Sequence, residues 1–273
     1  MGMVVNFNAA AINAQRNLSN TGKSLNQSIQ NLSSGLRVNS AADDPSGLVT
    51  SEQMRAQADG LAQAIRNSND GINLIKTAEG ALNEVHSLLR QMRTLAVHAA
   101  NAGVNSGADV AADQAALDAA VTSITRIATT TQFNGKALLD GTYTAKNLQI
   151  GSNSTDTVAL TITNQDAATL SVTGLNLSTS PGAAITAIDA AITTVSTSRA
   201  ALGATQKYTL DTTINSLGIA EENIRASEST IRDADMSKEM VMFTRNNIMS
   251  QAGTAMLAQA NQTSQGVLQL LRG

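Results

Sequence analysis

The sequence contains no cysteine and no tryptophan, and only two of its 273 residues are proline. The lack of cysteine excludes a disulfide framework, a thiol nucleophile and a zinc site built on thiolates. Aromatic residues make up only 2% of the chain, so the apolar residues are mainly Ala, Leu, Ile, Val and Met. Such residues suit narrow helical seams better than a broad core. Few prolines also leave long stretches in which helices can run without interruption.

Charged residues are scarce as well, at 14% of the chain against roughly 25% in an average soluble domain. The net charge is −3, and no basic stripe indicates a nucleic-acid partner. The N-terminus has no basic segment followed by an apolar core, as a secretory signal peptide would have, and no run of about 18 apolar residues could span a bilayer. We therefore expect no nucleic-acid binding and no membrane insertion. The chain is either cytoplasmic or exported without such a signal peptide.

Apolar residues near the N-terminus recur every seven residues, with a second row between them at alternating spacings of three and four. This pattern predicts a helix with a heptad seam. Several seam positions carry polar residues or glycine, so the seam should be weak alone and need a partner helix. The residues of this predicted seam are Leu18, Gly22, Leu25, Ile29, Leu32 and Leu36.

The C-terminal segment shows the same diluted pattern, which predicts a second weak amphipathic helix. Asp235 is its expected N-cap, and Glu239 in the first turn favours the helix dipole. Two seams that cannot close alone are expected to close on each other. The predicted seam residues here are Met249, Ala252, Met256, Val267 and Leu270.

Between the two ends, helical periodicity runs from about 47 to 100 and returns after Pro181. A turn is expected over 101–109 and a shorter helix over 111–128, while Asn134-Gly135 and Asp140-Gly141 are hairpin-turn signals. The Thr-rich alternation in "DTVALTITN" and "TLSVTGLNLS" predicts a few short strands.

The predicted fold is therefore mainly α, a long helical coiled-coil or rod built from both chain ends with a small β-containing insert. We expect three parts. A terminal coiled-coil assembly domain would comprise 1–40 and 235–273, a helical rod domain 41–142 and 182–234, and a small variable outer insert 143–181.

No stretch of the sequence carries a convincing catalytic, cofactor or metal motif. His86 and His98 lie outside any HExxH pattern, and "TGKS" at 21–24 lacks the first glycine of a phosphate-binding loop. The pair Asp43-Asp44 supplies too few oxygen ligands for calcium. Asp44 before Pro45 instead predicts an N-cap followed by a proline at the first helical position, which makes this segment a joint between two helices. We expect no catalytic, cofactor-binding or metal-binding residues and no enzymatic activity.

Several long motifs resemble those of one family, the bacterial flagellins, in the same order along the chain. They are "LSSGLRVNSAADDPSGL" (32–48), "NSNDGINLIKTAEGALNEV" (67–85), "TQFNGKALLDG" (131–141), "IRDADMSKEM" (231–240) and "NIMSQAGTAMLAQANQTSQGVLQLLR" (247–272). The resemblance covers roughly 1–142 and 182–273. The closing "VLQLLR" favours the filament protein over its relative at the hook–filament junction.

The resemblance implies a structural subunit that polymerises with copies of itself into the flagellar filament used for motility. It further implies export, unfolded, by the flagellar type III apparatus, with a chaperone that holds the C-terminal segment, and contacts with hook-associated and cap proteins. The expected location is the extracellular filament, and a periplasmic filament is the alternative. Weak terminal helices suggest that ordering of these helices is coupled to assembly.

The resemblance also implies a contact region for a Toll-like immune receptor, where many flagellins read "RVRELAVQ" and this chain reads "QMRTLAVH". Arg93 and Leu95 match the pattern, whereas Gln91, Thr94 and His98 depart from it. Loss of an arginine and a glutamate removes charge-assisted contacts, so we expect weakened recognition.

Three alternatives to a filament subunit remain at the level of sequence. One is the junction protein of the same family, and another is a coiled-coil adaptor that does not polymerise. The third is an enzyme carried by the insert. The insert contains no His, Cys or Glu, which argues against the enzyme.

Overall fold

The computed structural model describes residues 8–270, with side chains from residue 8 to residue 262. Contacts divide the chain into two compact units. The terminal unit comprises 1–56 and 223–273, and the central unit comprises 57–222. These boundaries fall inside helices rather than at the joint predicted near residue 40. The predicted mainly α fold with a small β-containing insert is confirmed.

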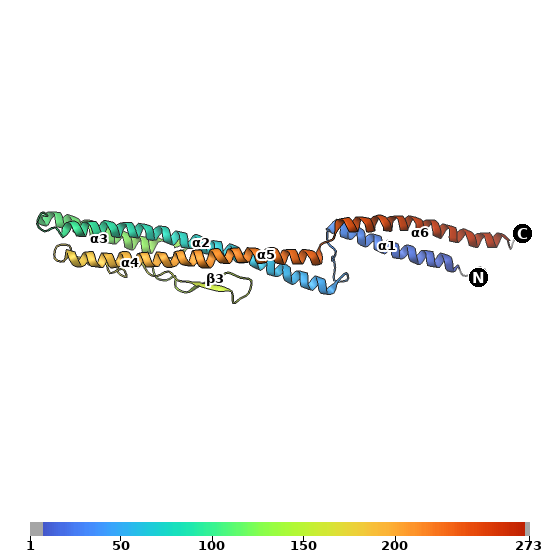
Figure 1. Cartoon of the computed structure of the whole chain (residues 1–273), viewed down its shortest axis with the longest axis horizontal. Coiled ribbons are helices and arrows are strands. Elements are labelled where there is room, and N and C mark those ends of the chain that lie inside the picture. The colour runs from blue at the N-terminus through green and yellow to red at the C-terminus, as the bar shows by residue number, and fades with distance from the viewer. Residues whose placement is uncertain (1–7, 271–273) are drawn as a thin grey trace. The chain divides into compact units, whose positions relative to one another are not determined.

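Two antiparallel helices form most of the terminal unit, α1 (Ala9–Ser34) and α6 (Met236–Leu270) (Figure 1). Their antiparallel pairing follows from contacts at both ends. The Nδ2 of Asn8 donates to the carbonyl oxygen of Ala260 at 2.9 Å, and Leu36 and Asp233 form an antiparallel bridge. Helix α1 begins with Asn8 as N-cap and ends at Gly35, whose φ of 72° is the left-handed conformation that glycine adopts without strain.

The segment "AADDPSG" is a joint in which the two aspartates have different tasks. The side chain of Asp44 accepts the backbone N–H of Gly47 at 2.9 Å, so Asp44 caps helix α2 (Pro45–Ala99), with Pro45 at its first position. Asp43 instead accepts the backbone N–H of Ser40 at 2.9 Å and closes the preceding turn. Hydrogen bonds to the charged form lower the pKa of both carboxyls.

In the central unit, α2 lies beside α3 (Gly107–Thr130) and α4 (Pro181–Ala204) (Figure 1). Helix α3 starts at a capping box, in which Ser106 and Asp109 satisfy each other's backbone N–H groups. This start is earlier than the one predicted near residue 111. The Nε of Arg93 on α2 donates to Asp189 on α4 at 2.6 Å and links the two helices.

Helix α4 continues through a π-helical turn, η1 (Thr205–Leu210), into α5 (Asp211–Arg232). Leu202 and Leu210 are both buried although eight residues separate them. In an uninterrupted α-helix that separation would rotate the two side chains by about 80° relative to each other. The wider π turn takes up most of this rotation, so both leucines face the core. The sequence pattern predicted continuous helix here and did not reveal the turn.

Two small antiparallel hairpins follow α3, and the second of them lies in the insert (143–181). Strands β1 (Gln132–Phe133) and β2 (Lys136–Ala137) flank the predicted turn at Asn134-Gly135, and β3 (Lys146–Gln149) pairs with β4 (Thr157–Leu160). The strand predicted in "TLSVTGLNLS" and the hairpin turn predicted at Asp140-Gly141 are wrong. Residues 169–178 form turns closed by local hydrogen bonds, such as that from the N–H of Val172 to the carbonyl of Ala167. The alternation reflects Leu170, Val172 and Leu177 being buried in turns rather than in a strand.

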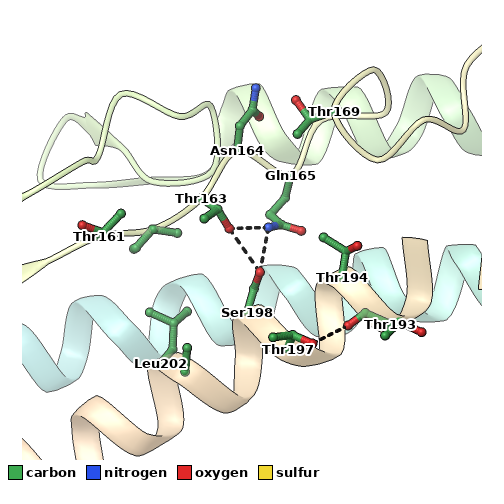
Figure 2. A pocket seen from close by; sticks show the side chains of 12 residues that line it. Thr161, Thr163, Asn164, Gln165, Thr169, Thr193, Thr194, Thr197, Ser198 and Leu202 are labelled. Carbon is green, nitrogen blue, oxygen red and sulfur yellow. Dashed lines mark hydrogen bonds between the residues drawn. The ribbon is translucent and has the colours of Figure 1, made fainter. Parts of the chain in front are cut away.

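Two side-chain amides fasten the insert to the helices. The Nε2 of Gln165 donates to the hydroxyl oxygens of Thr163 at 2.7 Å and of Ser198 on α4 at 3.0 Å (Figure 2). Gln114 on α3 binds the turn that follows, because its Nε2 donates to the carbonyl of Leu175 and its Oε1 accepts the N–H of Leu177. The insert is therefore part of the central unit rather than an independent domain.

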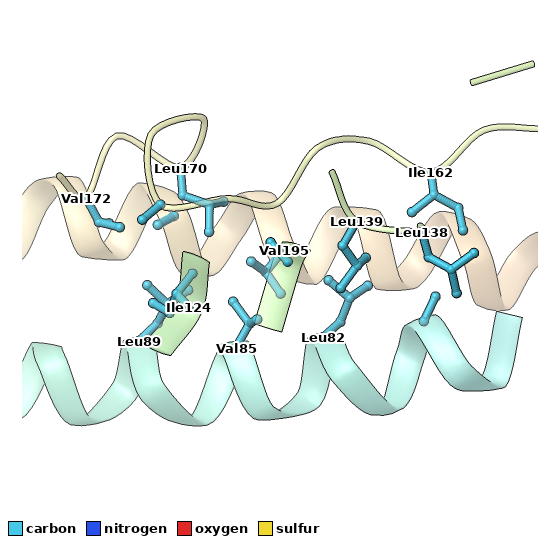
Figure 3. Packing of buried hydrophobic residues seen from close by; sticks show 14 of the residues in the cluster. Leu82, Val85, Leu89, Ile124, Leu138, Leu139, Ile162, Leu170, Val172 and Val195 are labelled. Carbon is cyan, nitrogen blue, oxygen red and sulfur yellow. The ribbon is translucent and has the colours of Figure 1, made fainter. Parts of the chain in front are cut away.

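One apolar core fills the space between the helices and the insert (Figure 3). Helix α2 supplies a row at heptad spacing, and α3, α4 and the insert cover it from other sides. Burial of these aliphatic side chains provides the main stabilisation of the central unit. The residues at the centre include Leu82, Val85, Leu89, Ile124, Leu138, Leu139, Ile162, Leu170, Val172 and Val195.

Candidate assembly surface

The face of α1 that meets α6 is more polar than the sequence predicted. Leu18, Leu25 and Leu32 are partly buried in it, as expected. The second row consists of Thr21 and Ser28, both buried, instead of Gly22 and Ile29. Gly22 is only partly buried, and Ile29 is 47% exposed. The predicted second row of α1 is therefore wrong by one residue as an intrachain seam. Leu36, past the end of α1, is partly buried and takes part in the bridge to Asp233.

The inner face of α6 combines small or polar residues with large apolar ones. Phe243, Ser250, Gly253 and Leu257 are partly buried at spacings of three, four and seven. A Cβ at Gly253 would lie 3.2 Å from Cδ1 of Leu18, which shows how closely the two helices approach there. This close approach explains which face of α6 meets α1. Small side chains let the two helices approach, whereas a row of methionines would hold them apart.

The apolar residues predicted to face α1 lie on the outside of α6. Met249 is 46% exposed and Met256 is 66% exposed, and Ala252 is exposed as well. The prediction that these three residues close the pair within one chain is wrong. Val267 and Leu270, the remaining members of that predicted seam, lie outside the residues whose side chains the structure describes.

Several exposed apolar side chains lie along α6, and we call them the outer row of α6. Part of it lines a shallow hollow of about 540 Å³ that also includes Thr244 and Arg245. Exposed apolar side chains on α1, Ile12 and Ile29, add to the apolar area of the terminal unit. Several large apolar side chains exposed along one helix indicate an interaction site. The outer row consists of Met240, Val241, Ile248, Met249 and Met256.

The joint beneath the helix pair is held by hydrogen bonds from two arginines. The Nη1 of Arg232 donates to Glu52 at 2.5 Å, and the backbone N–H of Arg37 donates to the carbonyl of Arg232 at 2.7 Å. The guanidinium of Arg37 also binds the carbonyl of Ile231. Asp235 accepts the backbone N–H groups of Ser237 and Lys238 at 3.0 and 3.1 Å, which is the geometry predicted for the N-cap of α6.

The residues predicted as receptor contacts lie on α2. Two of them, Arg93 and His98, pair with aspartates of the same chain. Gln91 and Thr94 are exposed and Leu95 is partly buried. Arg93 is paired with Asp189, and the ring Nδ1 of His98 lies 2.6 Å from Oδ2 of Asp113. The hydrogen bond and the negative charge of Asp113 raise the pKa of His98.

His86 has the opposite environment. Burial is the main cause that lowers its pKa, and the positive charges of Arg90 and Arg199 add to the effect. The described residues also do not meet what metal binding requires. Within residues 8–262, no cluster of three or more His, Cys, Asp or Glu side chains could hold a metal ion. Among the described helices, none is both long enough and apolar enough to cross a membrane. The outer row is thus the feature of the terminal unit that most clearly indicates a function.

Comparison with known proteins gives the family. The profile of the bacterial flagellin N-terminal helical region matches residues 5–144, and that of the bacterial flagellin C-terminal helical region matches residues 185–271. The chain belongs to the bacterial flagellin family. The two matched regions contain both terminal helices, whereas 145–184, which includes β3 and β4, lies between them.

Similar proteins match this flagellin along nearly its whole length. Flagellin of Halalkalibacterium halodurans is 50% identical and flagellin of Bacillus subtilis 45% identical, each over 99% of this chain and 100% of the relative. The flagellar filament 33 kDa core protein of Treponema phagedenis is 42% identical over the same shares. The crystal structure of Bacillus cereus flagellin matches with a TM-score of 0.50 and 30% identity, over 56% of this chain and 88% of that one.

Sequence reasoning missed the inner face of α6 because it followed the neighbouring row of Met249, Ala252 and Met256. The signal was nevertheless present, since Ser250, Gly253 and Leu257 repeat at the spacing of a seam. Small residues at seam positions indicate close helix packing as clearly as large ones indicate burial.

Proposed function

We propose that this chain is the structural subunit of a bacterial flagellar filament and that it polymerises with copies of itself to serve motility. The observation that carries the proposal is the outer row of α6, which exposes Met249 and Met256 while the chain pairs α1 and α6 through Thr21, Ser28 and Gly253. A helix pair whose inner face mixes leucines with hydroxyl groups and glycine, and which leaves methionines exposed on the outside, is incomplete as a monomer. Membership of the flagellin family supports the same conclusion. The role is structural rather than enzymatic.

Assembly completes the packing of the terminal unit. A seam with buried hydroxyls gives α1 and α6 little stability alone, so their full ordering is coupled to contact with neighbouring subunits. The outer row of one subunit then becomes buried against others, and this burial supplies the driving force. Contacts that repeat head to tail without closing on themselves build an open helical polymer.

Other partners follow from the family. We propose that a flagellar export chaperone holds the C-terminal segment, that the type III export apparatus passes the chain out of the cell, and that hook-associated and cap proteins contact it at the filament ends. An apolar face such as the outer row needs cover before assembly, which supports the chaperone. The filament is extracellular in this proposal.

Recognition by a Toll-like receptor is proposed to be weak. Thr94 and Gln91 replace the charged residues of the usual pattern. The pairing of Arg93 with Asp189 leaves fewer N–H donors of the guanidinium for a receptor. A cell reporter assay with purified monomer measures this directly, and potency equal to that of a flagellin with the intact pattern would contradict it.

The decisive experiment places charge on the outer row. The double variant Met249→Asp and Met256→Asp should keep the helical content of the monomer, because both side chains are exposed, and should fail to form filaments after seeding. The control carries the same charge at Gln251→Asp and Thr254→Asp, two exposed polar positions of the same helix. Circular dichroism and electron microscopy give the two readouts. Normal filaments from the first variant would refute the role of the outer row.

A truncation tests the whole terminal unit. Removal of 235–273 should leave a folded central unit, whose core lies within 57–222, and should abolish polymerisation. Filaments formed by the truncated chain would refute the proposed assembly mechanism. Absence of filaments from the intact chain would instead favour a coiled-coil adaptor that does not polymerise.

A further inference from the structure

A pocket of about 560 Å³ lies in the central unit between the segment 161–169 and helix α4 (Figure 2). Ile162 and Leu202 are buried in its wall, Ala201 and several threonines also line it, and most of its surface is apolar. No Asp, Glu, Lys, Arg or His lines the pocket. Its interior is therefore uncharged and mainly apolar.

One buried polar atom in the pocket has no partner. The side chain of Gln165 is fully buried, and its Nε2 donates hydrogen bonds to the hydroxyl oxygens of Thr163 and Ser198. Its Oε1 is buried without a hydrogen bond. In Figure 2 the carbonyl end of this amide points away from Thr163 and toward the part of the pocket beside Thr194. Burial of a carbonyl oxygen without a donor is unfavourable, so a donor that reaches this oxygen would bind favourably.

The hydroxyl groups on the α4 side add acceptors rather than donors. Thr193, Thr194 and Thr197 donate their hydroxyl protons to backbone carbonyls one turn earlier, at 2.9 to 3.0 Å. Their oxygens can then only accept hydrogen bonds from a molecule in the pocket. The pocket thus offers unused acceptors in an apolar, uncharged wall.

We propose that this pocket binds a small neutral molecule that carries a hydroxyl donor on an apolar body, with the hydroxyl donating to Oε1 of Gln165. The apolar body packs against Ile162, Leu202 and the threonine methyl groups. A charged molecule fits poorly, because no opposite charge compensates for its loss of water. The site shares no residue with the outer row and does not depend on it.

Cyclohexanol is the probe, because it joins one hydroxyl to an apolar ring. Saturation-transfer NMR on the full-length monomer should show saturable binding of cyclohexanol. Its methyl ether, which keeps the ring but cannot donate, should bind about tenfold more weakly. Cyclohexylammonium should also bind more weakly than the alcohol. Equal binding of alcohol and ether, or no saturable binding of the alcohol, would overturn the proposal.

Two variants locate the binding. Ala201→Leu should fill the pocket and abolish cyclohexanol binding, whereas Ala200→Leu, an exposed neighbour on α4 that does not line the pocket, should leave it unchanged. Gln165→Met removes the acceptor and should make alcohol and ether bind equally. Circular dichroism of each variant establishes that it is folded. Undiminished binding to folded Ala201→Leu would place the probe elsewhere and refute the site.

Discussion

Removal of the buried hydroxyls from α1 should stabilise the terminal helix pair. Thr21 and Ser28 face α6 with 8% and 3% of their surface exposed. The substitution Thr21→Val replaces the hydroxyl by a methyl group of similar volume, and Ser28→Ala removes the hydroxyl. An apolar group in place of a hydroxyl at a buried position gains about 1 kcal/mol in proteins, so the double variant should gain about 2 kcal/mol.

Hydrogen exchange measures this gain directly, because amides in α1 exchange when the pair opens. A gain of about 2 kcal/mol corresponds to roughly thirtyfold slower exchange of the protected amides of α1 and α6 in the monomer. Amides of the central unit should not change. The control is Ser24→Ala, which makes the same kind of change at an exposed position of α1. Unchanged or faster exchange in the double variant would refute the argument that polar residues weaken the seam.

Three further predictions concern packing and titration. Leu89→Ala, in the core of the central unit, should lower the free energy of unfolding by about 3 kcal/mol in urea titrations; a loss below about 1 kcal/mol would contradict the described core. Gly253→Leu should force α6 away from Leu18 and speed hydrogen exchange in α1, whereas Ala255→Leu on the exposed face should not. In NMR titrations His98 should titrate above its ordinary pKa and His86 below it. The stability from His98 is then present below its ordinary pKa and lost as pH rises through its folded pKa. The contribution of His86 to stability is present above its ordinary pKa and is lost as pH falls through its folded pKa. The reverse order of the two midpoints would contradict both environments.

Features that depend on a few neighbouring residues were predictable from the sequence. Asp44 and Asp235 cap helices where the sequence places them, and Asn134-Gly135 forms the expected hairpin turn. Each depends on hydrogen bonds within about four residues, so no knowledge of the rest of the chain is needed. The earlier start of α3 was also encoded locally, in the capping box at Ser106 and Asp109.

The sequence did not predict in the same way which face of α1 meets which face of α6. Periodicity shows that apolar residues share a face, but it does not show whether this face meets a helix of the same chain or of another. Met249 and Met256 have the spacing of a seam and lie outside it. The alternation around Leu170 and Val172 failed for a related reason, since burial in turns against helices produces the same pattern as a strand.

The π-helical turn η1 marks the place where this helix can lose one residue without moving the buried side chains on either side. The turn contains one residue more than an α-helix would need to keep Leu202 and Leu210 on the same side. Loss of one residue within 205–209 would convert the turn to ordinary α-helix and leave both leucines buried. A deletion elsewhere in α4 would rotate every later side chain by about 100°. The segment is therefore where the helix can absorb a change of one residue, so that mutations altering its length need not disturb the core on either side.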